Sequence, residues 1–349
     1  MKKGAKVFVG LSGGVDSATS AALLLKDGYN VTGVFITITV DGYPCTAAED
    51  RLDAMRAAAH LKIPFVDIDL SKEYQERVFA ESIKEFEAGR TPNPDTLCNK
   101  EIKFGLFYEW AKAQGADYVA TGHYAQIKDG MLCAGADANK DQSYFLWAVP
   151  QEVLRHALFP IGHLQKLEVR KLAGKFALPN ADRKDSQGLC FLGPISVGDM
   201  LKKELHPAPG DVLDESGAVI GTHEGAQLYT LGQRHGFALK AHGPSAPPHY
   251  VIAKDMTANT ITVSASKFPA GASKTTLKLG STNWIGEVES GKVSARYRYR
   301  QELIPAHLDK QSGTVMLEEP HYAPLGQSLV AYAHGRCLGG GVIEEVSVY

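Results

Sequence analysis

Cysteine, net charge and long apolar runs are scarce in this sequence, and each scarcity excludes a class of protein. Five cysteines occur among 349 residues, at positions 45, 98, 133, 190 and 337, and none forms a Cys-x-x-Cys pair. Disulfide-stapled secreted domains and structural zinc sites need denser or paired cysteines, so we expect neither. Every apolar run is shorter than the roughly 18 residues of a membrane span. With no signal-peptide pattern at the N-terminus, we expect a cytoplasmic protein without a membrane partner.

Charge and composition narrow the class further. The chain carries 37 Lys and Arg against 39 Asp and Glu, a net charge of −2, so a wholly basic nucleic-acid coat is excluded. A local basic patch is still compatible with this balance. Hydrophobic residues make up 44% and charged residues 22%, which excludes a disordered chain. A length of 349 residues corresponds to about two to three domains.

Short β-branched segments alternate with helical patterns through the first part of the chain. Strands are expected at 7–10, 31–38, 63–68 and 117–122. Helices are expected at 17–26, 51–60, 72–89, 101–114 and 164–176. Such alternation is typical of a parallel sheet with helices on both faces. We therefore predict a doubly wound α/β domain over residues 1–205.

The pattern changes at 206–210, where proline and glycine indicate a linker. Short strands are expected next at 211–219, 251–253 and 260–263, with a loop over 236–248. From about residue 270 the alternation is β-like, without a helix-length pattern. We predict a small central β-rich domain over 206–268 and a C-terminal β-barrel over 269–349.

The residues Ser12–Ser17, in the sequence SGGVDS, join the first expected strand to the first expected helix. Glycines let a backbone approach an anion closely, and a helix N-terminus offers unpaired N–H groups and a positive dipole. Asp16 could hold Mg²⁺ or shape the loop, and the Gly-Lys-Ser/Thr ending of the Walker motif is missing. A glycine turn with an aspartate cap is the alternative. In this context we interpret the six residues as a nucleotide site.

Two cysteines stand in settings that favour reactivity. Cys98 follows two prolines in TPNPDTLCN and precedes an expected helix, whose N-terminal dipole stabilises a thiolate. Cys190 follows a glycine turn in DSQGLCF, and Arg183 and Lys184 just before it could lower its pKa. A lone cysteine is more often a small buried hydrophobe, so spacing alone leaves both interpretations open.

Nine segments in chain order give the sequence a family resemblance. They are SGGVDS, GRTPNPDTLCN, KFG, ATGHYA, KDQSYFL, RKDSQGLCFLG, YTLGQRHG, RYRYRQ and CLGGGVI. The first matches the signature of the ATP pyrophosphatases, which cleave ATP between the α and β phosphates. Together the nine resemble the tRNA-specific 2-thiouridylases, which place sulfur at C2 of the wobble uridine. The resemblance implies an ATP-dependent tRNA sulfurtransferase that releases AMP and pyrophosphate.

By that resemblance Cys190 receives a persulfide, Cys98 attacks its terminal sulfur, and Asp95 acts as acid or base. Whether the persulfide or a released sulfide attacks the activated uridine stays open. Bridging the two cysteines requires movement, because a disulfide needs Cα atoms within roughly 7 Å. The implied cofactors are ATP and Mg²⁺. The implied partners are tRNA, through the anticodon loop of the Lys, Glu and Gln species, and a cysteine desulfurase or relay protein that donates sulfur.

The resemblance also assigns binding residues, and it gives the C-terminal barrel a tRNA-contacting role. Those implied for ATP are Gly10, Leu11, Ser12, Gly13, Gly14, Val15, Asp16, Ser17, Ile36 and Gly122. Those implied for the target base are Asn93, Pro94 and Asp95. Those implied for tRNA are His123, Lys140, Asp141, Gln142, Arg298, Tyr299 and Gln327.

Arginine and tyrosine alternate over 296–300, which predicts three guanidinium groups on one strand face, suited to phosphates. A solvated strand face is the alternative. The chain departs from its relatives at 36–43, where they carry a Met-Lys-x-Trp stretch, and at His235, where they commonly carry arginine. These departures fall at the implied adenine pocket and at one implied phosphate contact. Cys45 and Cys133 receive no role.

Two other functions are compatible with parts of the sequence. The first is an adenylating ligase or amidotransferase that acts on a small metabolite, which would leave both motif cysteines unexplained and lacks a visible glutaminase domain. The second is a non-catalytic tRNA-binding protein, which would leave the intact loop, Asp95 and the cysteines unexplained.

Overall fold

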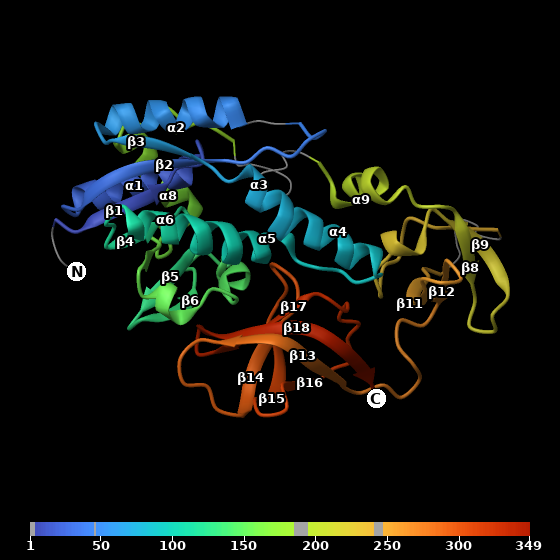
Figure 1. Ribbon diagram of the computed structural model, residues 1–349. Helices are drawn as coiled ribbons and strands as arrows, with labels where there is room; N and C mark the ends of the chain where they lie inside the picture. The colour runs from blue at the N-terminus through green and yellow to red at the C-terminus, as the bar shows by residue number, and fades with distance from the viewer. Residues whose placement is uncertain (1–3, 45–46, 185–194, 241–246) are drawn as a thin grey trace.

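The computed structural model of the chain describes residues 4–44, 47–184, 195–240 and 247–349. Cys45 and Cys190 lie outside the described residues. Figure 1 shows an α/β domain at the N-terminal end, a small β domain at the far side and a β-barrel beneath the long helices. In the described ranges, no helix combines the length and the apolar character of a membrane span.

Five parallel strands form the sheet of the N-terminal domain, in the order β3-β2-β1-β4-β7. Their bounds are β1 (Lys6–Gly10), β2 (Asn30–Thr37), β3 (Phe65–Asp69), β4 (Tyr118–Ala120) and β7 (Ala157–Leu158). The strand order runs outward from β1 in both directions, so the predicted doubly wound sheet is confirmed. Sheets of this kind bind ligands beside the carboxyl ends of the strands where the order reverses, here β1 and β4.

Helices cover both faces of this sheet, because its strands carry apolar side chains on both sides. Val7 and Val9 point to one face and pack in one core with residues of α1 (Val15–Lys26) and α2 (Ala47–Leu61). Phe8 points to the other face, where its ring lies 5.5 Å from that of Trp110 in α6 (Phe107–Ala113). The helix α8 (Lys166–Lys175) packs against α1. Figure 1 shows α2 above the sheet and α6 below it.

Two longer helical segments lie between the sheet and the other domains. The first comprises α3 (Ser71–Tyr74), the π-helical η1 (Gln75–Phe79) and α4 (Ala80–Glu87). The second comprises α5 (Pro94–Leu97), the π-helical η2 (Cys98–Leu106) and α6. It begins earlier than the expected residue 101, because Asn93 accepts a hydrogen bond from the Thr96 N–H at 3.1 Å and Pro94 occupies the first helical position. Cys98 therefore lies within the helix.

The central domain is a five-stranded sheet in the order β10-β9-β8-β12-β11. Its elements are β8 (Gly210–Leu213), β9 (Val219–His223), the 3-10 turn η4 (Ala226–Leu228), β10 (Ala238–Leu239), β11 (Tyr250–Asp255) and β12 (Thr260–Ser264). The helix α9 (Val197–Leu205) precedes them and packs its Met200 and Leu201 in the core of the N-terminal domain. The single strand expected over 211–219 is wrong. Asp214 accepts hydrogen bonds from the N–H groups of Ser216 and Ala218 at 2.8 and 2.9 Å, which closes a turn and makes a hairpin. The loop expected over 236–248 contains β10.

The C-terminal domain is a closed antiparallel barrel, as predicted. Its strands are β13 (Thr275–Trp284), β14 (Gly291–Arg296), β15 (Ile304–Asp309), β16 (Thr314–Leu317), β17 (Ser328–Ala333) and β18 (Arg336–Val348). Pairing of β13 with β18 closes the ring. A hairpin from the N-terminal domain, β5 (Ala125–Lys128) and β6 (Met131–Ala134), extends this sheet, because Cys133 pairs with Arg336 of β18. This hairpin is not among the strands expected from the sequence.

Candidate active site

A tight loop follows β1 at the point where the strand order reverses. Ser17 Oγ accepts a hydrogen bond from the Ser12 N–H at 3.1 Å and donates to the Gly14 carbonyl at 3.2 Å, so the loop closes on itself. Gly13 has a φ of +77°, and a Cβ there would lie 2.4 Å from the Asp50 carbonyl oxygen. Only glycine fits at this position. The loop therefore presents its backbone at the N-terminus of α1, a geometry suited to an anion.

Gly122 closes the same loop from the end of β4. A Cβ on this residue would lie 2.7 Å from the Ser17 nitrogen and 2.8 Å from the Asp16 carbonyl carbon. The absence of a side chain is thus what allows the two strand ends to meet. The structure brings together residues that the sequence assigned to ATP from positions far apart in the chain, and the glycine cradle fits a phosphate chain.

Ile36 lies in β2 where that strand extends beyond β1. The ladder between β1 and β2 ends at the pair Gly10–Val34. Residues of a strand direct their backbone groups alternately to the two neighbouring strands, so Ile36 directs its N–H and C=O to the same side as Val34. These groups lie past the end of β1, above the loop. This placement is compatible with the backbone contact to adenine that the sequence implies.

The loop is also held from the outside, by contacts that the sequence did not predict. Asn180 Nδ2 donates to the Gly13 carbonyl at 2.7 Å. The Arg183 guanidinium donates to the same carbonyl at 3.3 Å and forms ion pairs with Asp50 and Asp53 in α2. Arg183 was expected to act on the pKa of Cys190, which lies outside the described residues, so that expectation is untested. The structure instead shows its guanidinium fixing the loop Ser12–Ser17.

Asp16, the residue considered for Mg²⁺, has two partners to which the sequence assigned no role. Lys166 Nζ lies 2.8 Å from both carboxylate oxygens of Asp16. The Tyr124 hydroxyl donates to Oδ1 at 2.8 Å. Carboxylate oxygens are the ligands that Mg²⁺ prefers, so Asp16 fits that assignment chemically. In the protein alone, the Asp16 carboxylate is therefore paired with the Lys166 ammonium and the Tyr124 hydroxyl.

Cys98 and Asp95 lie one turn apart on the helix that begins at Pro94. Cys98 is fully buried, whereas Asp95 is half-buried. Cys98 is the first residue of η2, and π-helical stretches are frequent at functional sites. Farther along η2, the ring of Phe104 lies 6.0 Å from that of His123, which directly follows Gly122. The cysteine helix thus leads to the strand end that closes the nucleotide loop.

A loop of the barrel meets the segment assigned to the target base. The Thr91 N–H donates to the Leu325 carbonyl at 2.7 Å. Gln327 Oε1 accepts hydrogen bonds from Asn93 Nδ2 at 3.1 Å and from the Tyr144 hydroxyl at 3.0 Å. The structure therefore joins Asn93 and Gln327, which the sequence assigned to the base and to tRNA, across the domain boundary.

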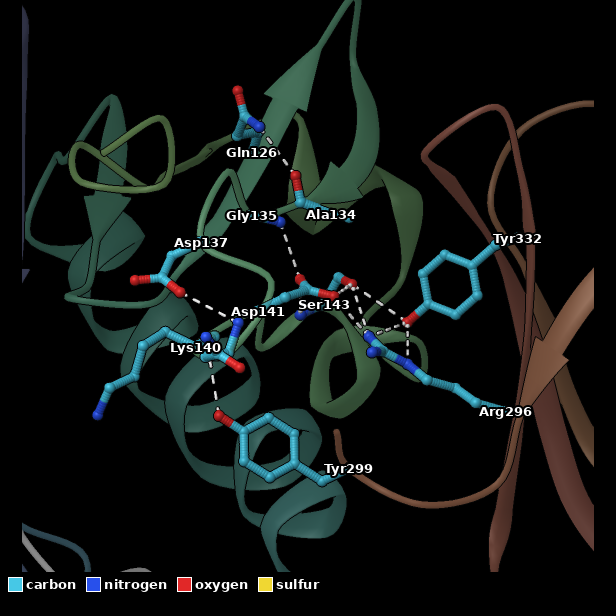
Figure 2. A network of polar contacts seen from close by, with 11 residues as sticks. Gln126, Ala134, Gly135, Asp137, Lys140, Asp141, Ser143, Arg296, Tyr299 and Tyr332 are labelled. Carbon is cyan, nitrogen blue, oxygen red and sulfur yellow. Dashed lines mark hydrogen bonds and ion pairs between the residues drawn. The ribbon is translucent and has the colours of Figure 1, made fainter. Parts of the chain in front are cut away.

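Asp141 and Arg296 form a buried network between the domains, shown in Figure 2. Arg296 Nη2 lies 2.6 Å from Asp141 Oδ2 and 2.7 Å from the Tyr332 hydroxyl. Ser143 Oγ donates to the same Asp141 oxygen at 3.1 Å. The side chains of Asp141 and Arg296 are 6% and 7% exposed. The tRNA contact of Asp141 stays a prediction, and its observed partner is the barrel.

The prediction of three guanidinium groups on one strand face is wrong. Strand β14 ends at Arg296, whose guanidinium is buried. Gln301 Oε1 accepts hydrogen bonds from the N–H groups of Tyr297 and Arg298 at 3.0 and 3.1 Å, so these donors turn the chain instead of continuing the ladder. Arg300 has a φ of +62°, which completes the turn. Of the arginines at 296, 298 and 300, the last two are exposed.

The other residues assigned to tRNA differ in exposure. Arg298 is exposed, and Lys140 is half-buried with its carbonyl 3.5 Å from the Tyr299 hydroxyl. Gln142 Oε1 accepts from the Tyr124 N–H at 3.0 Å. His123 is buried, and burial lowers the pKa of its imidazole well below the usual range, so it is neutral. Its Nδ1 lies 2.7 Å from Thr121 Oγ1.

Comparison with known proteins gives full-length matches. Family models described as the tRNA methyl transferase HUP domain, the tRNA methyl transferase PRC-barrel domain and the aminomethyltransferase beta-barrel domain match residues 5–194, 198–265 and 274–343. The chain is 41% identical to the tRNA-specific 2-thiouridylase MnmA of Lacticaseibacillus paracasei, over 97% of this chain and 94% of that protein. It is 42% identical to the protein of that name from Shouchella clausii, over 98% and 97%.

Similarity to solved structures is lower. A 4-thiouridine synthetase in complex with RNA and bound ATP is 18% identical, with a TM-score of 0.36 over 57% of this chain and 49% of that chain. An NMN synthetase from Francisella tularensis is 20% identical, with a TM-score of 0.32 over 53% and 67%.

Proposed function

Because this chain belongs to the family of the tRNA-specific 2-thiouridylases, we propose that it is an ATP-dependent sulfurtransferase that thiolates C2 of the wobble uridine of tRNA. The observation that carries the proposal is the meeting of the loop Ser12–Ser17 with Gly122, at the edge to which the Cys98 helix leads. A ligase for a small metabolite would use the loop, but Asp95 and Cys98 would have no role in its reaction. A non-catalytic tRNA-binding protein would need neither the loop nor these two residues.

The first chemical step is activation of a poor electrophile. The uridine O2 forms a bond to the α-phosphorus of ATP, the bond from that phosphorus to the bridging oxygen breaks, and pyrophosphate leaves with the electron pair. The loop N–H groups and the N-terminus of α1 bind the phosphates, and Gly122 permits their close approach. Backbone groups of Ile36 bind the adenine. Mg²⁺, with Asp16 as its protein ligand, would neutralise phosphate charge.

The second step replaces oxygen by sulfur. A sulfur nucleophile forms a bond to C2, and AMP leaves with the former uridine oxygen. The sulfur comes from a persulfide on Cys190, a cysteine outside the described residues. Cys98 attacks the Cys190 sulfur of that persulfide, so that a disulfide forms between the two cysteines and the terminal sulfur leaves, either as sulfide or already bonded to C2. Asp95, one turn before Cys98, transfers the protons. Attack on C2 by the persulfide itself or by released sulfide is compatible with this arrangement.

Substrate and partners follow from the same site. Asn93, Pro94 and Asp95 receive the target base, which must leave its stack for the reaction. Gln327 holds this segment in place. The residues that contact the tRNA directly are Lys140, Gln142, Arg298 and Tyr299. Asp141 and His123 are buried and support these contacts from inside the protein. The substrates are the tRNAs for Lys, Glu and Gln. A cysteine desulfurase or relay protein supplies sulfur in the cytoplasm.

The test is a mercury-gel mobility assay that separates thiolated from unthiolated tRNA. Unmodified tRNA is incubated with the protein, ATP, Mg²⁺ and a persulfide donor, and AMP is measured in parallel. We expect a retarded band with the wild type and with Cys133→Ser, the matched control, since Cys133 lies in the hairpin strand β6. Cys98→Ser and Cys190→Ser should give no band. A band that persists in both variants, or no tRNA-dependent AMP in the wild type, would contradict the proposal.

A further inference from the structure

Lys166 reaches the nucleotide loop from a part of the chain that no motif connects to it. It is the first residue of α8, and its ammonium lies 2.8 Å from both oxygens of Asp16, in the first turn of α1. The Lys166 side chain is 12% exposed and that of Asp16 31%. A lysine that ordinarily extends into solvent is here folded inward against the loop.

The backbone of Lys166 is fixed, which directs the side chain. Its N–H donates to Asp137 Oδ2 at 2.9 Å. Gln165 and Glu168 form a capping box at the same helix start, in which the Gln165 N–H donates to Glu168 Oε2 at 2.7 Å. The Cα of Lys166 is therefore held at the start of α8, and rotation about the side-chain bonds is what would move the ammonium toward a ligand.

The contacts around Asp16 hold the ammonium at the mouth of the loop. Lys166 Nζ lies 5.8 Å from the centre of the Tyr124 ring, and the Tyr124 hydroxyl donates to the same carboxylate. Burial of a lysine is costly without an anion nearby. Asp16 supplies that anion in the protein alone, and the phosphates of a bound nucleotide supply a second anion at the neighbouring loop.

We propose that Lys166 is a catalytic residue that binds the β and γ phosphates of ATP and stabilises the pyrophosphate as it leaves. This inference rests on the proposed function, because it concerns the same adenylation. When the bond from the α-phosphorus to the bridging oxygen breaks, negative charge grows on that oxygen. An ammonium held beside the loop lowers the energy of this charge more than that of the intact ATP.

The experiment compares Lys166→Met with Lys171→Met, a matched control on the exposed side of α8. Binding of inorganic pyrophosphate and of AMP is measured by calorimetry, without tRNA and without turnover. We expect Lys166→Met to weaken pyrophosphate binding roughly 10- to 100-fold, as for the loss of a hydrogen bond to a charged group. AMP binding should stay unchanged, and Lys166→Arg should recover most of the pyrophosphate affinity. The rate of tRNA-dependent AMP formation should fall with Lys166→Met alone.

Three results would overturn the inference. Equal pyrophosphate affinity in Lys166→Met and Lys171→Met would remove Lys166 from the phosphate site. Equal weakening of AMP and pyrophosphate, with a lower melting temperature and no recovery in Lys166→Arg, would show that Lys166 only supports the fold of the loop. In both cases a wild type that forms AMP leaves the proposed function standing. A wild type that binds neither pyrophosphate nor ATP would overturn the nucleotide assignment itself.

Discussion

Replacing Arg296 by Met is expected to lower the free energy of unfolding by about 3–5 kcal/mol, the usual cost of leaving one member of a buried ion pair alone. Arg296 and Asp141 form such a buried pair, because their side chains are 7% and 6% exposed and their charged atoms lie 2.6 Å apart. The Tyr332 hydroxyl accepts a hydrogen bond from the same guanidinium nitrogen at 2.7 Å, so a third polar group also loses its partner. The substituted residue lies at the contact between the α/β domain and the barrel.

The assay is equilibrium unfolding followed by tryptophan fluorescence. Trp147 lies at the domain boundary, where its carbonyl accepts a hydrogen bond from Asn283 Nδ2 at 2.6 Å. The matched control is Arg298→Met, since Arg298 is exposed and surface charges contribute roughly 0–1 kcal/mol. The double variant Asp141→Leu with Arg296→Met should regain most of the loss, because an apolar replacement removes the buried charge.

Two outcomes would refute this reasoning. One is an Arg296→Met protein that unfolds within about 1 kcal/mol of Arg298→Met, which would mean that water or another cation satisfies Asp141. The other is a double variant no more stable than the single one, which would mean that packing and not the charge of Asp141 determines the loss.

Three further predictions concern the site. Gly122→Ala should reduce adenylation roughly 100-fold, because its Cβ would meet backbone atoms at 2.7 and 2.8 Å. The control is Gly174→Ala in α8, which should retain activity because no atom lies within 4 Å of the added Cβ. Equal rates of AMP formation in the two variants would disprove this prediction. Gln327→Ala should raise the KM for tRNA roughly 3- to 10-fold and leave the KM for ATP unchanged, because it removes the hydrogen bond to Asn93. Gln311→Ala, in an exposed turn, is the control. A change in the KM for ATP alone would contradict the prediction. The melting temperature should fall as pH drops below 6.5, the usual pKa of histidine, because the unfolded chain then binds a proton that buried His123 does not. His123→Asn should reduce this fall and exposed His163→Asn should not, and identical pH profiles would exclude His123 as its source.

The local parts of the site were predictable because neighbouring residues determine them. An apolar strand, two glycines and a helix follow one another at the loop Ser12–Ser17, and each property belongs to the chain segment itself. The hairpin β5–β6 could also have been found. Asp129 and Gly130 both adopt positive φ, 51° and 74°, and Asp-Gly between alternating residues is a strong hairpin signal.

The long-range partners were not predictable in the same way. The alternation of Arg296 to Arg300 indicates which side chains share a face if the strand continues, but Gln301 ends the strand. Burial of Arg296 depends on Asp141, which belongs to another domain. The pairing of Lys166 with Asp16 depends on how α8 packs beside α1. A charged residue carries no local sign of whether its partner is water or a distant carboxylate.

One continuous segment, residues 122–146, links the nucleotide loop to the barrel. It begins at Gly122 against the loop, and Tyr124 then contacts Asp16. The hairpin β5–β6 joins the barrel sheet, Asp141 binds Arg296, and the Tyr144 hydroxyl donates to Gln327. Because this segment contacts both the loop and the barrel, we expect a shift of the barrel on tRNA binding to reach Asp16. A variant that breaks the Asp141–Arg296 pair should therefore need more tRNA for half-maximal AMP formation before it loses ATP binding, which tRNA titration in the AMP assay and calorimetry with ATP would measure.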